Sequence, residues 1–290
     1  MKKLPYIYII LASVLWGTSG LFVYYLSGFG LSSVQMTCIR TSTAAVCTVI
    51  YALVRNRELF KTNPKELFLF FLIGVSLFLT GTFYFLAMQA SSVSTAVVLM
   101  YTAPIFVMIY SVSFLGEKLT GFKTLSVVFM LIGCALVSGI IGGLVFSIRG
   151  IVMGIMAGLS YSMYNIVTKI GMRKGSNPVS ASMYCFIFAA IISFFVSNPS
   201  NVVEIILRNE AKVSLAMLAC GVCTCILPYL FYTLALRKIP AGTASALAVV
   251  EPMAATVFSV AFLDEKLQLF PFIGIVLIIS SVFMLSRVKE

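Results

Sequence analysis

The sequence predicts an all-α integral membrane protein of ten transmembrane helices, arranged as two inverted five-helix repeats. Three observations predict this fold class: the composition, the spacing of long apolar stretches, and an internal repeat. Of the 290 residues, 61% are hydrophobic and 10% are charged, whereas a soluble domain is about 45–50% apolar and about 25% charged. The mean hydropathy of +1.08 agrees. So few polar residues cannot cover a soluble domain, and the solvent of this chain is therefore mostly lipid.

The composition also excludes several functions. Soluble enzymes, DNA-binding modules and secreted disulfide scaffolds are excluded, and the net charge of +11 therefore does not indicate a nucleic-acid partner. Histidine is absent and Asp264 is the only aspartate, which removes histidine acid–base chemistry and most metal sites. The sequence has no Gly-x-x-x-x-Gly-Lys-Ser/Thr loop for ATP hydrolysis. We therefore expect no cofactor and no metal.

Apolar stretches of about 20 residues recur along the chain, and this is the length that crosses about 30 Å of hydrocarbon as a helix. The first follows two lysines, but it is too long for the apolar part of a signal peptide, so we expect it to be retained. The predicted spans lie at residues 6–26, 33–54, 67–87, 93–115, 121–139, 150–170, 179–197, 213–236, 241–263 and 268–286.

The positive charges orient these spans. With ten spans both termini share one side, and that side then holds 15 of the 20 Lys and Arg residues. The other side holds four, and Arg40 lies within a span. Because Lys and Arg concentrate in cytoplasmic loops, we expect a multi-pass protein of the plasma (inner) membrane with both termini in the cytoplasm.

The chain repeats itself at an offset of 148 residues. Residues 83–119 match residues 231–267 at 15 of 37 positions, where composition alone predicts roughly a tenth. The predicted units are therefore residues 1–139 and 150–290, joined by a linker at 140–149.

The odd number of spans in each unit determines how the two units are oriented in the membrane. With five spans a unit, the two units enter the membrane in opposite senses. Inverted repeats suit a transporter, because the same pattern can open either face of a shared site near the midplane. A purely structural membrane protein has no need of this symmetry.

Pro104 and Pro252 occupy matching positions in the middle of two spans. A proline in a helix removes a hydrogen-bond donor and clashes with the carbonyl four residues earlier, at Met100 and Ala248. One interpretation is a passive kink that shapes helix packing. The other is a kink that lines the substrate path and takes part in gating.

Two ionisable residues, Arg40 and Glu251, are firmly intramembrane. A charge near the bilayer centre costs about 2.5–3.5 kcal/mol on insertion scales, so such residues face a bundle interior or a wet cavity. They can form an ion pair with each other, or pair separately with backbone carbonyls. Alternatively, Glu251 binds an ammonium group and Arg40 a carboxylate, or Glu251 carries a proton during transport.

Aromatic side chains within the spans complete the candidate binding site. Tyrosine and tryptophan usually collect at membrane interfaces, but here several lie deeper, where they either pack in the core or bind an amine or a flat ring. The predicted substrate-binding residues are Trp16, Arg40, Tyr84, Tyr101, Tyr161, Tyr164, Asn165, Tyr232 and Glu251.

Motifs in both halves resemble the drug/metabolite transporter superfamily, specifically its ten-helix EamA-type branch. The resemblance covers essentially the whole chain and is carried by Ala12-x3-Trp16-Gly17, Arg40, Tyr101-x2-Pro104, Phe114-Leu115-Gly116-Glu117, Glu251-Pro252 and Leu263-Asp264-Glu265. It implies two five-helix units, transport of amino acids or other small metabolites, often as export, and aromatic residues lining a central pocket.

The leading hypothesis is thus a secondary transporter, not an enzyme, that exports a small polar metabolite such as an amino acid or amine by alternating access. Proton coupling, a passive facilitator or channel, and a membrane-embedded lipid-group transferase are the alternatives. The expected partners are the small-molecule substrate and the lipid bilayer, with the protein a monomer or a homodimer.

Opposed insertion of the two units has a direct test at the repeated Glu-Lys pair. We expect epitope tags beside Lys118 and Lys266 to react with antibody on opposite faces of the membrane, Lys118 inside and Lys266 outside. A tag after residue 290 serves as the cytoplasmic control. Reaction of both internal tags on one face would contradict the inverted repeat.

Overall fold

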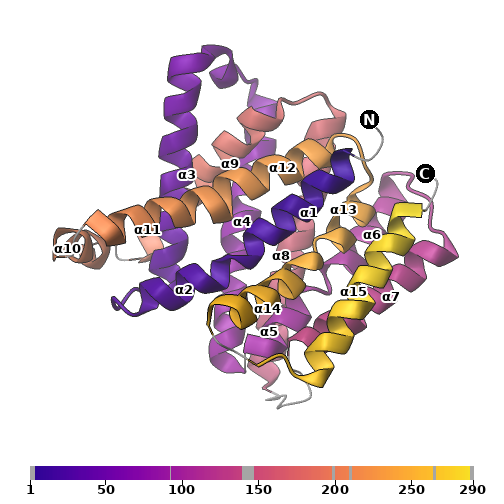
Figure 1. Cartoon of the computed structure of the whole chain (residues 1–290). Coiled ribbons are helices and arrows are strands. Elements are labelled where there is room, and N and C mark those ends of the chain that lie inside the picture. Colours follow the sequence, from indigo (N-terminus) through magenta and orange to yellow (C-terminus); the bar gives the residue numbers. More distant parts are fainter. Residues whose placement is uncertain are drawn as a thin grey trace.

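All regular secondary structure in the described residues is helical (Figure 1). The structure, a computed structural model, describes residues 4–91, 93–138, 147–197, 200–208, 211–263 and 266–287. Residues 140–146 of the predicted linker lie outside these ranges. The expectation of an all-α fold is confirmed.

The helices follow one another along the chain with short connections. The first half contains α1 (Leu4–Gly17), α2 (Ser19–Ser27), α3 (Ser33–Arg55), η1 (Arg57–Phe60), α4 (Pro64–Ala90), α5 (Val93–Met100), α6 (Ala103–Phe114) and α7 (Gly121–Val137). The second half contains α8 (Ile148–Arg173), α9 (Pro178–Ser197), α10 (Ser200–Arg208), α11 (Ala211–Gly221), η3 (Val222–Ile226), α12 (Leu227–Leu236), α13 (Ala241–Leu247), α14 (Val250–Phe262) and α15 (Leu269–Arg287).

Eight helical stretches in the described ranges are long and apolar enough to cross a membrane. Four of them join consecutive helices, for example α1 with α2 and α13 with α14. Two shorter apolar helices, Gly121–Val137 and Leu269–Leu285, coincide with the fifth and tenth predicted spans. The protein is therefore a multi-pass membrane protein, and a count of ten spans stays a prediction.

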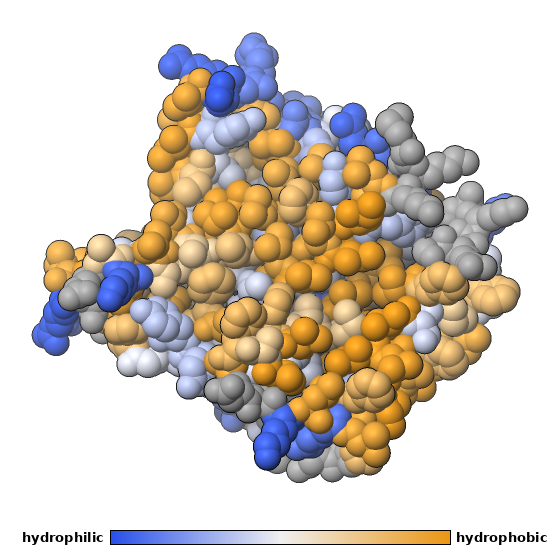
Figure 2. Space-filling view, in the orientation of Figure 1, coloured by the Kyte–Doolittle hydropathy of each residue, from blue (hydrophilic) through white to orange (hydrophobic). Residues whose placement is uncertain are grey.

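The surface is that of a protein in lipid. Figure 2 shows a face that is mostly hydrophobic, with hydrophilic residues gathered at its upper edge and at its left and lower edges. Large apolar side chains point outward from several helices, among them Val54 (75% exposed), Phe114 (73%) and Phe195 (82%). Exposure of this extent is unfavourable in water but favourable in hydrocarbon.

Polar side chains cap the starts of several long helices. The Ser32 hydroxyl accepts a hydrogen bond from the Gln35 N–H, and the Gln35 side chain accepts one from the Ser32 N–H, which is a capping box. Asn63, Thr120 and Ser147 each accept a backbone N–H at the starts of α4, α7 and α8. These caps satisfy donors that a helix cannot pair within itself.

The spans that contain Pro104 and Pro252 are each broken into two helices. The first breaks at Tyr101–Thr102, just before Pro104, and the second at Ala248–Val249, just before Pro252. The breaks thus fall at almost equivalent positions of the sequence repeat. Both proline kinks are observed, whereas their part in gating stays a prediction.

Glycines on α8 let it pack closely against α5. A Cβ atom added at Gly154 would lie 2.6 Å from Leu99 Cβ, and one added at Gly150 would lie 2.7 Å from Ser91 Cβ. At Gly158 the added atom would lie 3.0 Å from the Leu99 carbonyl oxygen. The spaced glycines therefore serve packing between the two halves of one chain.

We expect Gly154→Val to destabilise the protein by about 1–3 kcal/mol, because the added methyl groups overpack a contact with no free space. Gly20→Val is the matched control, since nothing lies within 4 Å of a Cβ added at Gly20. Reversible unfolding in mixed detergent micelles measures both. Equal losses for the two variants would contradict the packing argument.

Candidate functional site

The helix breaks place Glu251 and Tyr101 in the middle of the bundle. Glu251 lies in the first turn of α14, where the positive end of the helix dipole favours a carboxylate. Its carboxylate interacts electrostatically with Tyr84, Tyr101 and Tyr161, which come from α4, the α5–α6 break and α8. Glu251 keeps some accessible surface, although Val250 and Pro252 beside it are buried. One carboxylate thus faces three tyrosines.

Arg40 enters the same region from α3. Its Nε donates a hydrogen bond to the Cys225 sulfur at 3.3 Å, and Tyr229 lies within electrostatic reach. Cys225 belongs to η3, a π-helical turn that precedes Pro228 in α12. Such single π turns are rare and occur often at functional sites.

Aromatic rings fill the space between these two charges. Trp16 of α1 meets Tyr229 edge-on with ring centroids 5.0 Å apart, and Tyr232 at 5.4 Å. Tyr164 of α8 meets Tyr229 at 5.4 Å and Tyr161 at 6.4 Å. Rings at these distances and tilts attract one another beyond their shared burial. The cluster joins α1, α8 and α12.

Asn165 ties α8 to α12 within the cluster. The Tyr232 hydroxyl donates a short hydrogen bond to the Asn165 side-chain oxygen. The Asn165 amide nitrogen in turn donates to the Tyr161 carbonyl at 2.7 Å. Both Asn165 and Tyr232 are fully buried. These bonds make Asn165 a structural residue that positions the tyrosines. Both the oxygen and the nitrogen of its amide already form hydrogen bonds within the protein.

Three buried donors of the cluster have no hydrogen-bond partner of ordinary geometry within the described residues: Trp16 Nε1, Tyr101 Oη and Tyr161 Oη. Glu251 lies near Tyr101, and Asn165 and Tyr232 lie near Tyr161, but outside that geometry. An unpaired buried donor costs about 1–3 kcal/mol. Three such donors in one region of the bundle are suited to binding the polar groups of a ligand.

The central site, as we use the term below, consists of the nine predicted residues together with Tyr229. Arg40 and Glu251 interact electrostatically across it. Among the described residues, however, the ion pairs are Lys61–Glu58, Lys123–Glu117 and Arg208–Glu204, so Arg40 and Glu251 do not form one. The two embedded charges therefore stand apart on either side of the tyrosines.

Two residues of this region are not among those predicted from the sequence. Tyr229 touches Trp16 and Tyr164. The sequence could have identified it, because Tyr229 shares one helical face with Cys225 and Tyr232. Cys225 binds Arg40, and nothing in the sequence indicates that contact. Over the described ranges, no group of three or more His, Cys, Asp and Glu side chains could hold a metal ion.

Comparisons with known proteins decide the family. The EamA-like transporter family matches the chain twice, over residues 3–139 and 148–287. The chain belongs to the EamA-like transporter family. A protein of Archaeoglobus fulgidus is 27% identical over 96% of this chain and 95% of its own, and one of Clostridium kluyveri is 26% identical over 100% and 95%.

A third relative and a solved structure agree with this. A Bacillus subtilis protein, YwfM, is 23% identical over 97% of this chain and 93% of its own. All three relatives bear the name uncharacterized transporter. A solved crystal structure with 18% identity superposes on 97% of this chain and 95% of its own with a TM-score of 0.77, which shows a shared fold. Family and relatives point to a transporter rather than an enzyme.

The Arg40–Cys225 contact gives a test of the site's architecture. We expect Cys225→Ala to lower the free energy of unfolding by about 1–3 kcal/mol, because it leaves the guanidinium Nε without its acceptor. Cys223→Ala, two residues away on the same π turn, is the control. Chemical unfolding in detergent measures both, and equal stability of the two variants would contradict the contact.

Proposed function

We propose that the protein is a secondary transporter that moves a small metabolite with an amino group, an amino acid or an amine, across the plasma membrane by alternating access. Membership of the EamA-like family supports transport. The direction that we propose is export, as the resemblance to the superfamily implies. The substrate class rests on the chemistry of the central site.

The observation that carries the proposal is the Glu251 carboxylate. It forms no ion pair with any residue of the described ranges, yet it interacts electrostatically with the hydroxyl groups of Tyr84, Tyr101 and Tyr161. Ionisable groups inside a bundle are expensive and are retained for function. A carboxylate next to several aromatic faces suits an ammonium group, which gains both charge attraction and cation–π contact.

Arg40 supports a zwitterionic substrate. Its Nε is held by Cys225, and its two terminal nitrogens make no described hydrogen bond. A guanidinium presents such nitrogens as a fork that matches a carboxylate. An amino acid lying between Glu251 and Arg40 would thus meet a complementary charge at each end.

The same carboxylate can couple transport to protons. A carboxyl group that holds a proton in one state and an ammonium group in the other cannot hold both at once. Exchange of the two at Glu251 therefore links substrate export to proton entry. A facilitator or channel, by contrast, needs no such exchange and moves its solute only downhill.

Trp16 is the only tryptophan of the chain and lies in the central site. Its fluorescence in purified protein therefore reports ligand binding there. Titration with a panel of amino acids, amines and simple carboxylates should change the emission for compounds with an amino group and not for the carboxylates. A response confined to carboxylates would contradict the proposed substrate class.

We expect Glu251→Gln to abolish uphill transport of the compound that this titration identifies, measured in proteoliposomes with an imposed proton gradient. Loss of a charge-assisted contact of about 1.5–3 kcal/mol should also weaken Kd roughly 10- to 150-fold. Glu58→Gln, at an exposed surface pair, is the control. Undiminished uphill transport by Glu251→Gln would remove this residue from the mechanism, and purely downhill flux by the native protein would favour a facilitator.

A further inference from the structure

Polar contacts between the two halves gather at one end of the molecule. This end holds the connections α6–α7, α8–α9 and α12–α13, all on the predicted cytoplasmic side. Several hydrogen bonds that join the halves lie here. They run from Glu117 to Ala241 and Gly242, from Arg173 to Leu115, from Ser176 to Glu66, from Ser180 to Leu59 and from Tyr184 to Phe60.

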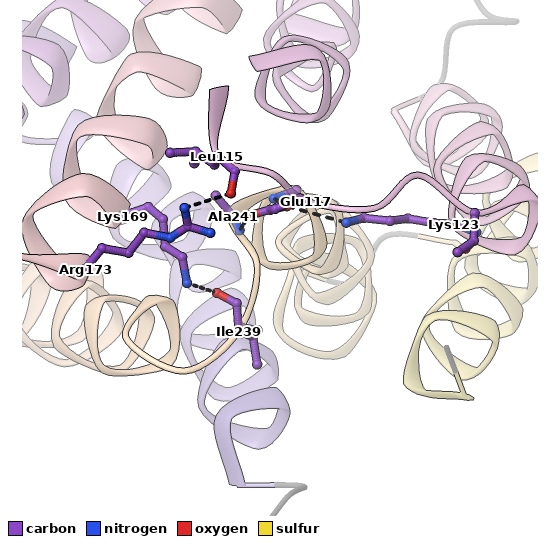
Figure 3. A network of polar contacts seen from close by, with 9 residues as sticks. Leu115, Glu117, Lys123, Lys169, Arg173, Ile239 and Ala241 are labelled. Atoms are coloured by element: carbon purple, nitrogen blue, oxygen red, sulfur yellow. Dashed lines mark hydrogen bonds and ion pairs between the residues drawn. The ribbon is translucent and has the colours of Figure 1, made fainter. Parts of the chain in front are cut away.

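Glu117, just after α6, holds the start of α13 in the other half (Figure 3). Its carboxylate accepts hydrogen bonds from the backbone N–H groups of Ala241 at 2.7 Å and Gly242 at 3.4 Å. Lys123 of α7 completes the arrangement with an ion pair at 3.5 Å, and the two side chains are only 4% and 3% exposed. The carboxylate thus neutralises a positive helix end and a buried ammonium group together.

Lys169 and Arg173 of α8 hold the neighbouring segments. The Lys169 ammonium donates to the carbonyls of Leu236 at 2.8 Å and Ile239 at 2.5 Å, at the end of α12. Arg173 donates to the Leu115 carbonyl at 2.8 Å. The α12–α13 connection is therefore fixed at both ends, by Lys169 before it and by Glu117 after it.

Among the described residues, the opposite end of α14 borders a hollow. This hollow of about 310 Å³ lies between α7, α14 and the start of α15, on the predicted outer side, and its wall includes Ala255, Ser259 and Lys266. Ala255 and Ser259 follow Glu251 at intervals of four residues, so they share its helical face. The hollow thus adjoins the face of α14 that carries the central carboxylate.

We propose that Glu117, Lys123 and Lys169 form a cytoplasmic latch. The latch closes the inner end of the transporter in the conformation of this structure, and it opens in every transport cycle. This inference rests on the proposed alternating access. The mechanical link is α13, which has seven residues and runs from the latch at Ala241 to the helix break at Ala248. Release of its first turn therefore frees the segment that positions Glu251.

The latch differs from an ordinary structural contact in its composition. A permanent seam between halves is as stable, or more so, when apolar residues replace a buried ion pair, because burial of two charges is costly. Here the buried groups are the charges of Glu117, Lys123 and Lys169 and the ends of two helices, all of which water can solvate once the end opens. The polar groups of such a seam can exchange their contacts for water when the halves separate.

The test follows accessibility on both faces. Ser245→Cys is a reporter behind the latch, because Ser245 is fully buried on α13, and Ser259→Cys reports the outer hollow. A membrane-impermeant maleimide is added to inside-out or right-side-out vesicles, and mass spectrometry reads the modification at each introduced cysteine. Mass spectrometry distinguishes the two introduced cysteines from the native ones, and the experiment needs no known substrate.

We expect Glu117→Ala to raise the labelling rate at position 245 from the cytoplasmic face by roughly tenfold, a shift of about 1.4 kcal/mol between the two states. Labelling at position 259 from outside should fall in the same protein. Lys118→Gln, at the exposed neighbour of Glu117, is the control and should change neither rate. Lys169→Met, which removes the bonds to α12, serves as a second variant should Glu117→Ala not fold.

The outcomes separate the latch from the proposed function. Unchanged labelling at position 245 in both variants overturns the latch and leaves the transport proposal intact. A rise at both positions means that the two ends open together, which overturns alternating access and the latch with it. A rise at position 245 with a fall at 259 supports both.

Discussion

The constraint on which this structure depends is that lipid offers no hydrogen bonds to the backbone. A span can be broken there only where protein covers the freed groups. Both breaks obey this rule, since Tyr101 is 2% exposed and Ala248 and Val249 are 0% exposed. Gly158 brings α8 close to the Leu99 and Met100 carbonyls at the first break. At the first break, the absence of a side chain at Gly158 thus lets α8 cover the freed backbone groups.

The helix breaks also position the polar groups of the central site. A continuous α13–α14 would hold Glu251 in mid-helix, without the helix start that now stabilises its charge. The α5–α6 break presents Tyr101 toward the same carboxylate. The central site is therefore a product of where the helices end. The ring contacts of Trp16 with Tyr229 and Tyr232 then hold α1 and α12 together in the same region.

The helical fold was predictable, because the need to match lipid can be read from the hydropathy along the sequence. The role of the nine predicted residues in binding stays a prediction. Hydropathy finds each stretch, and rare polar or aromatic residues within it mark the interior. The Arg40–Cys225 contact was not predictable, because it depends on the π turn that displaces Cys225. Nor was the contact of Glu117 with Ala241, 124 residues away. Its local sequence shows a repeated motif, but only packing of the halves shows what the carboxylate binds.

The energetics of the latch contacts explain why they suit an interface that opens and closes. The attraction between Glu117 and Lys123 is largely offset by the loss of their hydration. The hydrogen bonds of Glu117 and Lys169 to backbone groups are exchanged for bonds to water when the end opens, so each contributes only about 0.5–3 kcal/mol net. The closed arrangement is thus specific in geometry but only moderately favoured in free energy. Two conformations must lie within a few kcal/mol of each other for a ligand to shift their populations. An apolar seam of the same area would hold the halves too firmly for a ligand that binds through a few polar contacts.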